Sequence, residues 1–375
     1  MSHSNDKGIQ RAMITTDKGR TTTPRANLLR ALRRQGYDQV PLDCGGFCPS
    51  QQEAFEKRFG HGDIPDFFNV PARMTGIVQE KTWTDAKALY PREEVPADAE
   101  IDAFGVGHSH HPGCFHMTRM HHPLRGEDVT LAEIRDYPLP RIAGDAEGKV
   151  RDFVAAQQAR GLASMVGMHC TIWEIAWYLR SMEDLMADMM MEDERASVHL
   201  DRVTANAVER IRVAARAGAD IVQLGDDIGM QQSTMMSVDL WRTWLKPRLA
   251  EVIRAGRDIK PDLLIFYHSC GYVLPFLDDL IEIGIDILNP VQPECMPFED
   301  VFEKVGGRMS FWGTIGTQTT LPFGTPEGVR QEVWKNLRLC GPEGGLVIAP
   351  THLVEPEVPW ENLLAMKEAC ESFER

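Results

Sequence analysis

The second half of the chain alternates between short apolar runs and longer stretches in which apolar residues recur at helical spacing. Short runs bounded by Gly, Pro or charged residues predict buried strands, and the longer stretches predict amphipathic helices. Strands are expected at 40–44, 162–167, 219–225, 263–268, 286–290, 309–313 and 345–349. Helices are expected at 25–35, 52–59, 145–158, 171–191, 194–217, 237–255, 272–283, 298–304, 326–339 and 359–373.

This alternation predicts parallel strands joined by crossover helices. An eighth strand is expected in the less regular region, around 101–106. Seven or eight such units in one chain favour a closed (β/α)8 TIM barrel over an open sheet. No Gly-x-Gly-x-x-Gly fingerprint follows a predicted strand, which argues against a dinucleotide-binding fold. We expect a flexible arm at 1–22 and a single barrel domain at 23–375, with an irregular His-rich insertion at 60–144.

Composition narrows the range of partners. The chain has 375 residues and a formal net charge of -15, which argues against nucleic-acid binding and disfavours a strongly polyanionic substrate. No apolar run reaches the roughly 20 residues that span a bilayer, so no membrane association is expected. The polar start of the chain lacks the apolar segment of a secretory signal, and the eight Cys show no disulfide-framework spacing. A cytoplasmic location with reduced thiols is the expectation.

The strongest chemical signal is the sequence His268-Ser269-Cys270-Gly271 at the end of a predicted strand. Residues two apart on a strand point to the same side, so the imidazole of His268 and the thiol of Cys270 converge on one point. A nitrogen and a sulfur ligand together suggest Zn²⁺. The alternative is a buried His and a structural Cys that only pack.

Other polar residues follow the remaining predicted strands, where a barrel places its active site. His352 follows the last strand, and with His268 and Cys270 it forms a candidate zinc site with one open position, as in catalytic zinc centres. Asp227, Glu294 or Cys295 is the alternative third ligand, since each is expected on the same face of the barrel. Asp227 and Glu294 are candidates for handling or orienting a proton, with salt bridging at the rim as the alternative. Candidate substrate-binding residues are Asp226, Tyr267, Gln292 and Trp312, although aromatic residues on strands often serve only as core.

Six His residues and Cys114 crowd the stretch 108–122. A second metal site is conceivable there. The irregular spacing, interrupted by Pro112 and Gly113, does not match the paired ligands of a structural zinc site. His side chains that pack, cap or face water are the favoured interpretation of this stretch.

Several segments resemble the uroporphyrinogen decarboxylase superfamily, and within it the zinc- and cobalamin-dependent methyltransferase branch. They cover most of the chain: the predicted first helix and strand beginning at Thr23-Pro24, the acidic turn 226–231, the His-x-Cys-Gly motif at 268–271, the helix start at 324–329 and the closing segment 345–366. The resemblance implies a TIM barrel and an enzyme that moves a methyl group between a small substrate and a corrinoid.

Two positions depart from the family pattern. The methyltransferases usually supply a third metal ligand as Cys in a Pro-Gly-Cys turn, whereas this chain has Pro350-Thr351-His352, so imidazole replaces sulfur. The decarboxylases carry an arginine in the loop after the first strand that holds substrate carboxylates, whereas here the loop 42–48 contains no Arg. Porphyrinogen decarboxylation is therefore the weaker of the two functions implied by the resemblance.

The chain has no Asp-x-His-x-x-Gly stretch, the motif by which corrinoid proteins offer a His ligand to cobalt. We therefore expect a zinc-dependent methyltransferase that transfers a methyl group from a small methylated or methoxylated donor to a corrinoid carried by a separate protein. A homodimer is a further possibility. The alternatives are a uroporphyrinogen-type decarboxylase and a non-catalytic barrel that binds a metal or a small molecule. A zinc hydrolase ranks low because no His-x-His pair follows the first predicted strand.

Overall fold

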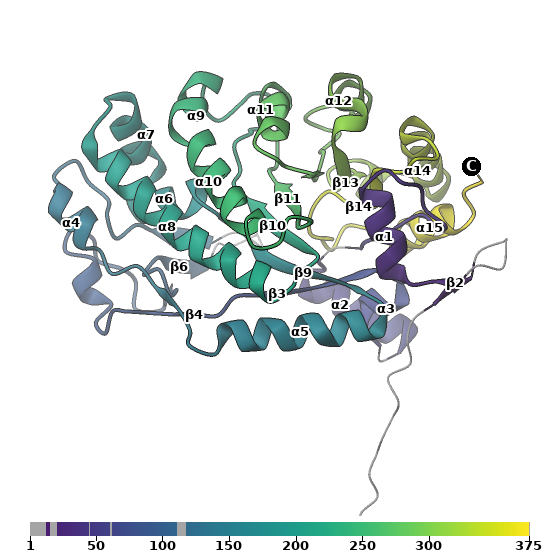
Figure 1. Ribbon diagram of the computed structural model, residues 1–375, viewed down its shortest axis with the longest axis horizontal. Coiled ribbons are helices and arrows are strands. Elements are labelled where there is room, and N and C mark those ends of the chain that lie inside the picture. The colour runs from purple at the N-terminus through teal and green to yellow at the C-terminus, as the bar shows by residue number, and fades with distance from the viewer. Residues whose placement is uncertain (1–12, 16–20, 45, 61, 111–117, 375) are drawn as a thin grey trace, which may run out of the picture.

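A curved parallel sheet of seven strands forms the centre of the protein in a computed structural model (Figure 1), which describes residues 13–15, 21–44, 46–60, 62–110 and 118–374. The order across the sheet is β14-β13-β12-β11-β10-β9-β3. The strand bounds are β3 Ala72–Gly76, β9 Ala163–Met168, β10 Ile221–Gly225, β11 Leu264–His268, β12 Ile287–Asn289, β13 Ser310–Ile315 and β14 Leu346–Pro350. The six strands predicted from 162 onward are confirmed.

The first predicted strand is reduced to a single bridge, in which Leu42 pairs in parallel with Ile348 of β14. Leu42 therefore takes the eighth place beside one end of the sheet, while β3 lies at the other end. A cavity of about 710 Å³ is lined by Val40 and Leu42 and by Val70 and Pro71, which directly precede β3. The arrangement is a TIM-barrel-like fold. In the described residues, no hydrogen-bonded ladder joins the segment of Leu42 to β3, so the barrel is not fully closed there.

The position expected for the eighth strand was wrong. The additional barrel strand is β3, whereas Ile101 belongs to β5 (Glu100–Ile101), which pairs antiparallel with β6. β3 has the sequence Ala-Arg-Met-Thr-Gly, in which only Ala72 is buried, so it shows no apolar run. The apolar segment at 101–106 is instead interrupted by a turn at Gly105, whose φ is 88°.

Helices line the outside of the curved sheet (Figure 1). The helices that follow the barrel strands and cover them are α5 Ala146–Arg160, α6 Trp173–Arg180, α7 Met182–Met190, α8 Glu194–Arg216, α9 Val238–Trp244, α10 Lys246–Arg257, α11 Leu277–Glu282, α12 Phe298–Val305, α13 Thr320–Phe323, α14 Pro326–Cys340 and α15 Trp360–Glu371. The stretch expected to be helical at 171–191 breaks at Ser181, whose φ is 72° and whose hydroxyl caps α7.

The amino-terminal segments surround one end of the barrel. They comprise β1 Ile14–Thr15, β2 Thr21–Thr22, α1 Pro24–Leu32, α2 Pro49–Phe59 and α3 Ile64–Phe67. Thr23 caps α1, since its side chain accepts a hydrogen bond from Ala26 N–H.

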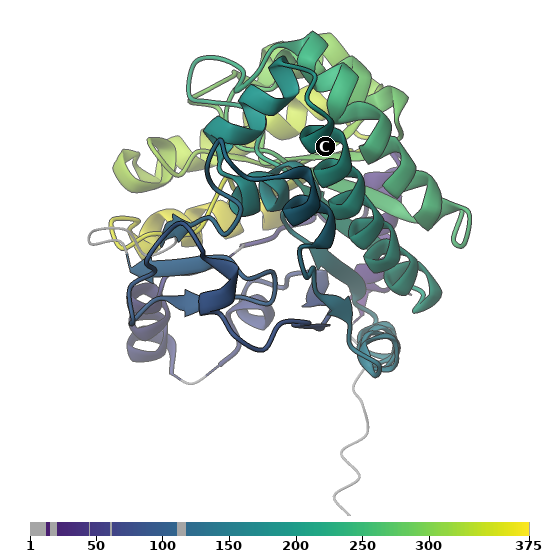
Figure 2. The same cartoon turned by 90° about the vertical axis from the view of Figure 1, so that its left-hand side faces the viewer.

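The region between β3 and α5 contains small antiparallel elements, which lie in the lower part of the molecule in Figure 2. β5 pairs with β6 (Gly107–His110), which pairs with β7 (Thr118–His121), and β4 (Gln79–Glu80) pairs with β8 (Arg141–Ile142). One helix, α4 (Leu131–Asp136), begins with a capping box formed by Thr130 and Glu133.

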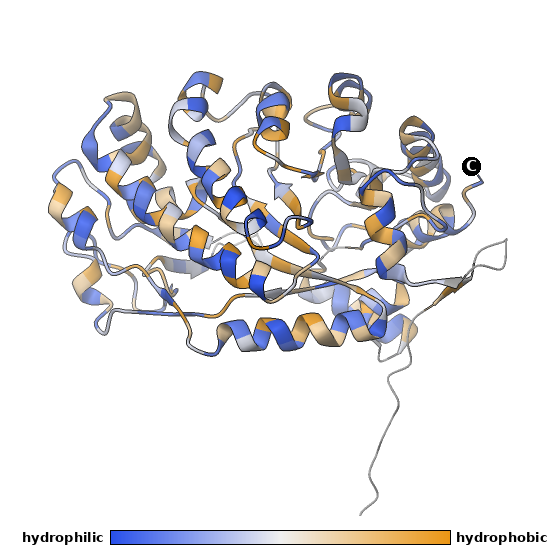
Figure 3. Cartoon of the chain, viewed as in Figure 1, coloured by the Kyte–Doolittle hydropathy of each residue, from blue (hydrophilic) through white to orange (hydrophobic). Residues whose placement is uncertain are grey.

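The core has two parts, and Figure 3 shows the corresponding mixture of apolar and polar faces on the helices. The larger part fills the layer between the sheet and the helices and includes Tyr267 and Phe311. The smaller part combines Leu28 and Leu32 of α1 with strand residues such as Phe266, together with Leu29, Ala72, Ala163, Met165, Ile221, Leu264, Ile287, Trp312, Val347 and Ala349. Each Leu buried in this way stabilises the fold by roughly 1.5–3 kcal/mol. No helix in the described part of the chain is both long and apolar enough to cross a membrane.

Candidate metal centre

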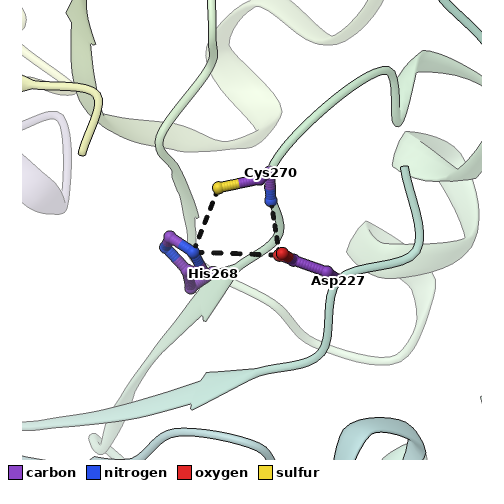
Figure 4. Close-up of side chains that lie close together, drawn as sticks. All are labelled: Asp227, His268 and Cys270. Atoms are coloured by element: carbon purple, nitrogen blue, oxygen red, sulfur yellow. Dashed lines mark hydrogen bonds and ion pairs between the residues drawn. The ribbon is translucent and has the colours of Figure 1, made fainter. Parts of the chain in front are cut away.

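The side chains of Asp227, His268 and Cys270 come together where β10 and β11 end (Figure 4). His268 Nε2 lies 3.4 Å from Cys270 Sγ and 3.8 Å from Asp227 Oδ1. One ligand atom from each of the three residues lies within 4.8 Å of the others. All three residues are only partly buried, so the cluster is open to a ligand. Nitrogen, sulfur and carboxylate oxygen are the donor types that bind Zn²⁺.

Backbone geometry brings the two strand ends into contact. Gly229 passes so close to the β11 loop that a Cβ there would lie 2.6 Å from the Cys270 carbonyl oxygen. Gly271 has a φ of 83° and is equally crowded by Gly229. Two small residues are therefore required at this crossing. Cys270 N–H donates to Asp227 Oδ1 at 2.7 Å, which ties the carboxylate to the Cys-bearing turn.

Burial raises the pKa of the Cys270 thiol, and the negative charge of Asp227 raises it further. Without a bound metal, the thiol of Cys270 therefore stays protonated at neutral pH. A divalent cation reverses this preference because the thiolate is the form that binds a metal.

A carboxylate that the sequence did not single out lies directly behind the cluster. Glu174 Oε2 accepts a hydrogen bond from Asp227 N–H at 3.3 Å, and Glu174 Oε1 accepts one from the Tyr178 hydroxyl at 2.8 Å. Burial, then the charges of Asp226 and Asp227, raises the pKa of Glu174 to about 8. Glu174 lies in the first turn of α6. It does not directly follow a strand, so its position in the sequence does not indicate a place in the site.

Asp226 points away from the metal cluster. Its carboxylate accepts hydrogen bonds from the N–H groups of Thr171, Ile172 and Glu174 at 3.0–3.1 Å. Burial raises the pKa of Asp226 to about 6, against the lowering effect of those backbone donors. The Tyr267 hydroxyl donates to the Asp226 carbonyl at 3.1 Å, from the layer between sheet and helices. These contacts favour positioning roles for both residues over contact with a substrate.

The remaining expected residues lie around the same end of the barrel. Gln292 Oε1 accepts from Gly271 N–H at 3.2 Å, which supports the turn that carries Cys270. Trp312 is part of the inner core, and its indole N–H donates to Asp43 Oδ2 at 2.9 Å. Glu294 Oε1 accepts from Thr319 Oγ1 at 2.9 Å, while its buried Oε2 has no hydrogen-bond partner among the described residues.

His352 does not join the group of three. It is partly buried and follows β14, but among the described residues the metal-type cluster contains only Asp227, His268 and Cys270. Asp227, which the sequence suggested for proton handling and as an alternative third ligand, lies where the third ligand is expected. Ligation by His352 stays a prediction.

His108, His121 and His122 of the stretch 108–122 are engaged in hydrogen bonds. His121 contacts Glu93 Oε1 through Nδ1 and Ser109 Oγ through Nε2, at 2.8 and 2.9 Å. His122 Nδ1 lies 2.8 Å from the Tyr178 carbonyl oxygen. His111, Cys114 and His116 lie outside the described residues.

Comparison with known proteins decides the family. The family model for uroporphyrinogen decarboxylase (URO-D) matches residues 119–373, which is more than half of the chain. The chain belongs to the uroporphyrinogen decarboxylase family. The match includes the strands from β9 to β14, and with them the residues of the candidate metal centre.

The proteins that resemble this chain carry two kinds of name. A protein named uroporphyrinogen decarboxylase from Pseudomonas syringae pv. syringae is 24% identical over 349 residues, covering 89% of this chain and 93% of its own length. One of the same name from Pseudomonas fluorescens is 25% identical over 357 residues, covering 91% and 95%. Among solved structures, a methyltransferase from Methanosarcina mazei superposes with a TM-score of 0.65 at 19% identity, covering 94% and 99%. The last likeness confirms the barrel-like fold.

Proposed function

We propose that this member of the uroporphyrinogen decarboxylase family is a zinc-dependent methyltransferase. It moves a methyl group from a small methylated or methoxylated substrate to a corrinoid carried by a separate protein. The observation that carries the proposal is the convergence of His268 Nε2, Cys270 Sγ and Asp227 Oδ1 at the carboxyl end of β11. This is the end at which barrels of this type place their chemistry.

The donor set fits zinc. Three protein ligands of mixed N, S and O type, with room for one further ligand, are typical of a catalytic rather than a structural zinc site. When bound there, zinc supplies Lewis acidity toward the heteroatom that carries the methyl group. Asp227, His268 and Cys270 hold the ion in this proposal, and His352 is the alternative third ligand.

The charge around the cluster argues against a porphyrinogen substrate. The turns that follow the barrel strands, at 43–47, 77–78, 169–171, 226–229, 269–271, 290–294, 316–318 and 351–353, contain no Lys or Arg. They do contain the carboxylates of Asp43, Asp227 and Glu294. A substrate with many carboxylates gains little there, because each of its charges needs a cationic partner when it leaves water. A neutral or cationic methyl donor suits this surface better.

Methyl transfer to a reduced corrinoid leaves the electron pair of the broken bond on the substrate heteroatom. An oxygen leaving group then needs one proton from the protein or from water. Glu294 is placed at the same barrel end and is the candidate for holding or orienting that proton, together with Asp227 if His352 proves to be the ligand. Because the chain lacks the Asp-x-His-x-x-Gly motif, the corrinoid arrives on a partner protein.

The test is an anaerobic assay with the zinc-loaded protein, cob(I)alamin and a panel of methyl thioethers, methylamines and methoxylated aromatics. Formation of methylcobalamin by the wild type but not by His268→Ala supports the proposal. Uroporphyrinogen is offered in parallel, since the curated relatives bear the decarboxylase name. Efficient formation of coproporphyrinogen with no methyl transfer would favour decarboxylation. Zinc binding with both assays silent would favour a non-catalytic barrel.

A further inference from the structure

Asn289 lies next to the metal cluster and has no assigned role. It is the last residue of β12, and in the strand register it is the direct neighbour of His268, the last residue of β11. His268 Nδ1 lies 2.5 Å from Asn289 Oδ1. On its other side, Asn289 Nδ2 donates to the Trp312 carbonyl oxygen on β13 at 2.7 Å. One amide therefore connects three adjacent strands, β11, β12 and β13.

The two contacts fix which way the amide of Asn289 faces. The Trp312 carbonyl can only accept a hydrogen bond, so the amide NH₂ must face it. The reversed amide would place two acceptor oxygens against each other at the same short distance. With the NH₂ committed to Trp312, the amide oxygen faces His268, and the imidazole must donate from Nδ1.

We infer that Asn289 is the positioning residue that holds His268 as the Nδ1–H tautomer, with the lone pair of Nε2 directed at Cys270 and Asp227. A neutral imidazole carries one ring proton, so a proton held on Nδ1 leaves Nε2 free to bind a metal. Free histidine in water prefers the opposite tautomer. In that tautomer Nε2 carries the proton, so Nε2 cannot bind a metal ion. A hydrogen bond to the ring nitrogen that does not bind the metal fixes the tautomer and the orientation of a His ligand. Loss of such a bond typically lowers the affinity for the metal about 10–100-fold.

The inference rests on the proposed use of His268 as a metal ligand, but its first test needs no metal. The ring nitrogens of the metal-free protein are followed by ¹⁵N NMR after ¹⁵N-histidine labelling, above the pH at which imidazoles titrate. A His268→Gln spectrum identifies the His268 signals among those of the twelve His residues. The wild type is expected to carry the His268 proton on Nδ1. A proton on Nε2 in the wild type would overturn the inference without the need for any variant.

Two variants separate positioning from general support of the fold. Asn289→Leu removes both hydrogen bonds at similar volume; we expect the His268 proton to move to Nε2 and the zinc dissociation constant to rise about 10–100-fold. Asn289→Asp keeps an acceptor for Nδ1–H and is expected to retain the tautomer and most of the affinity. Asn336→Leu is the control, because Asn336 is a buried Asn on α14 whose amide donates to Thr314 and does not contact His268.

The outcomes are distinguishable. If Asn289→Leu leaves both the tautomer and the zinc affinity of the wild type unchanged, or if Asn336→Leu lowers zinc affinity equally, Asn289 has only a structural role and the inference is wrong. If the wild type shows the Nδ1–H tautomer but the protein transfers no methyl group, the proposed function fails while the role of Asn289 stands.

Discussion

His268 Nε2 and Cys270 Sγ face each other across 3.4 Å at the end of one strand, with Ser269 turned to the opposite side. The relationship follows from the two-residue repeat of a strand, which the sequence already displays. Ser269 is buried, and its hydroxyl accepts from Ile228 N–H at 3.0 Å, so the residue between the two candidate ligands anchors the neighbouring turn. The spacing His-x-Cys thus places both side chains in one site and fixes the loop that brings Asp227 to it.

Replacing Cys270 by Ala is expected to reduce bound zinc from about one ion per chain to less than about 0.1, because the only sulfur within the cluster is lost. Elemental analysis after dialysis measures this ratio. Cys340→Ala is the matched control, since Cys340 is a buried thiol on α14 that lies outside the cluster. Equal zinc in wild type and Cys270→Ala would refute the assignment.

Variants of Asp227 and His352 identify the third ligand of the zinc ion. Asp227→Asn keeps an acceptor for Cys270 N–H but removes the charge, so zinc affinity should fall about 10–100-fold or more if Asp227 ligates. His352→Ala should weaken zinc binding and abolish methyl transfer if His352 is the ligand, and His352→Cys should then retain the metal. Competition with a chromophoric chelator measures each dissociation constant. A fall in only one of the two series identifies the ligand.

The sequence allowed prediction of the barrel strands from β9 to β14 and of the His–Cys pair, because both depend on local pattern. Three features depended on tertiary structure. β3 has no apolar run, since only Ala72 faces the core. Asp227 and His352 both follow strands, and only the meeting of the β10 and β11 turns shows that Asp227 reaches the cluster. Asn289 gives no signal in the sequence because its role comes from strand register.

Asp226→Ala is expected to destabilise the fold by about 2 kcal/mol or more. The change leaves the N–H groups of Ile172 and Glu174 without an acceptor, whereas Thr171 N–H keeps the Gly225 carbonyl, and each such orphan costs about 1–3 kcal/mol. Thermal or urea unfolding of the metal-free protein measures the loss. A variant as stable as the wild type but with an elevated KM would instead support direct contact between Asp226 and the substrate.

The buried imidazole of His199 gives the stability a specific pH dependence. Burial lowers the pKa of His199 to about 4, although the hydrogen bond to the Ala176 carbonyl opposes the shift. Between the ordinary pKa near 6.5 and that value, the unfolded state binds more protons than the folded state. The free energy of unfolding therefore has its full value above about pH 6.5. As the pH falls toward 4, protonation of His199 in the unfolded state lowers this free energy by roughly 3 kcal/mol.

His199→Gln tests this effect, because the amide keeps a donor for Ala176 and cannot titrate. Urea unfolding of the metal-free protein between pH 4 and 7 should show a steeper loss of stability in the wild type than in the variant. His110→Gln, at an exposed position, is the control and should follow the wild type. Parallel curves for wild type and His199→Gln would contradict the prediction.

In the proposed function, Cys270, His268 and one further residue at the barrel rim hold a catalytic zinc ion. X-ray absorption at the zinc edge tests this assignment most directly, because it reports the ligand types of the bound metal. The expected spectrum of the zinc-loaded wild type has one sulfur at about 2.3 Å and nitrogen or oxygen ligands at about 2.0–2.1 Å, and the sulfur shell disappears in Cys270→Ser. A zinc environment without sulfur in the wild type, or a sulfur shell that persists in Cys270→Ser, would contradict the account.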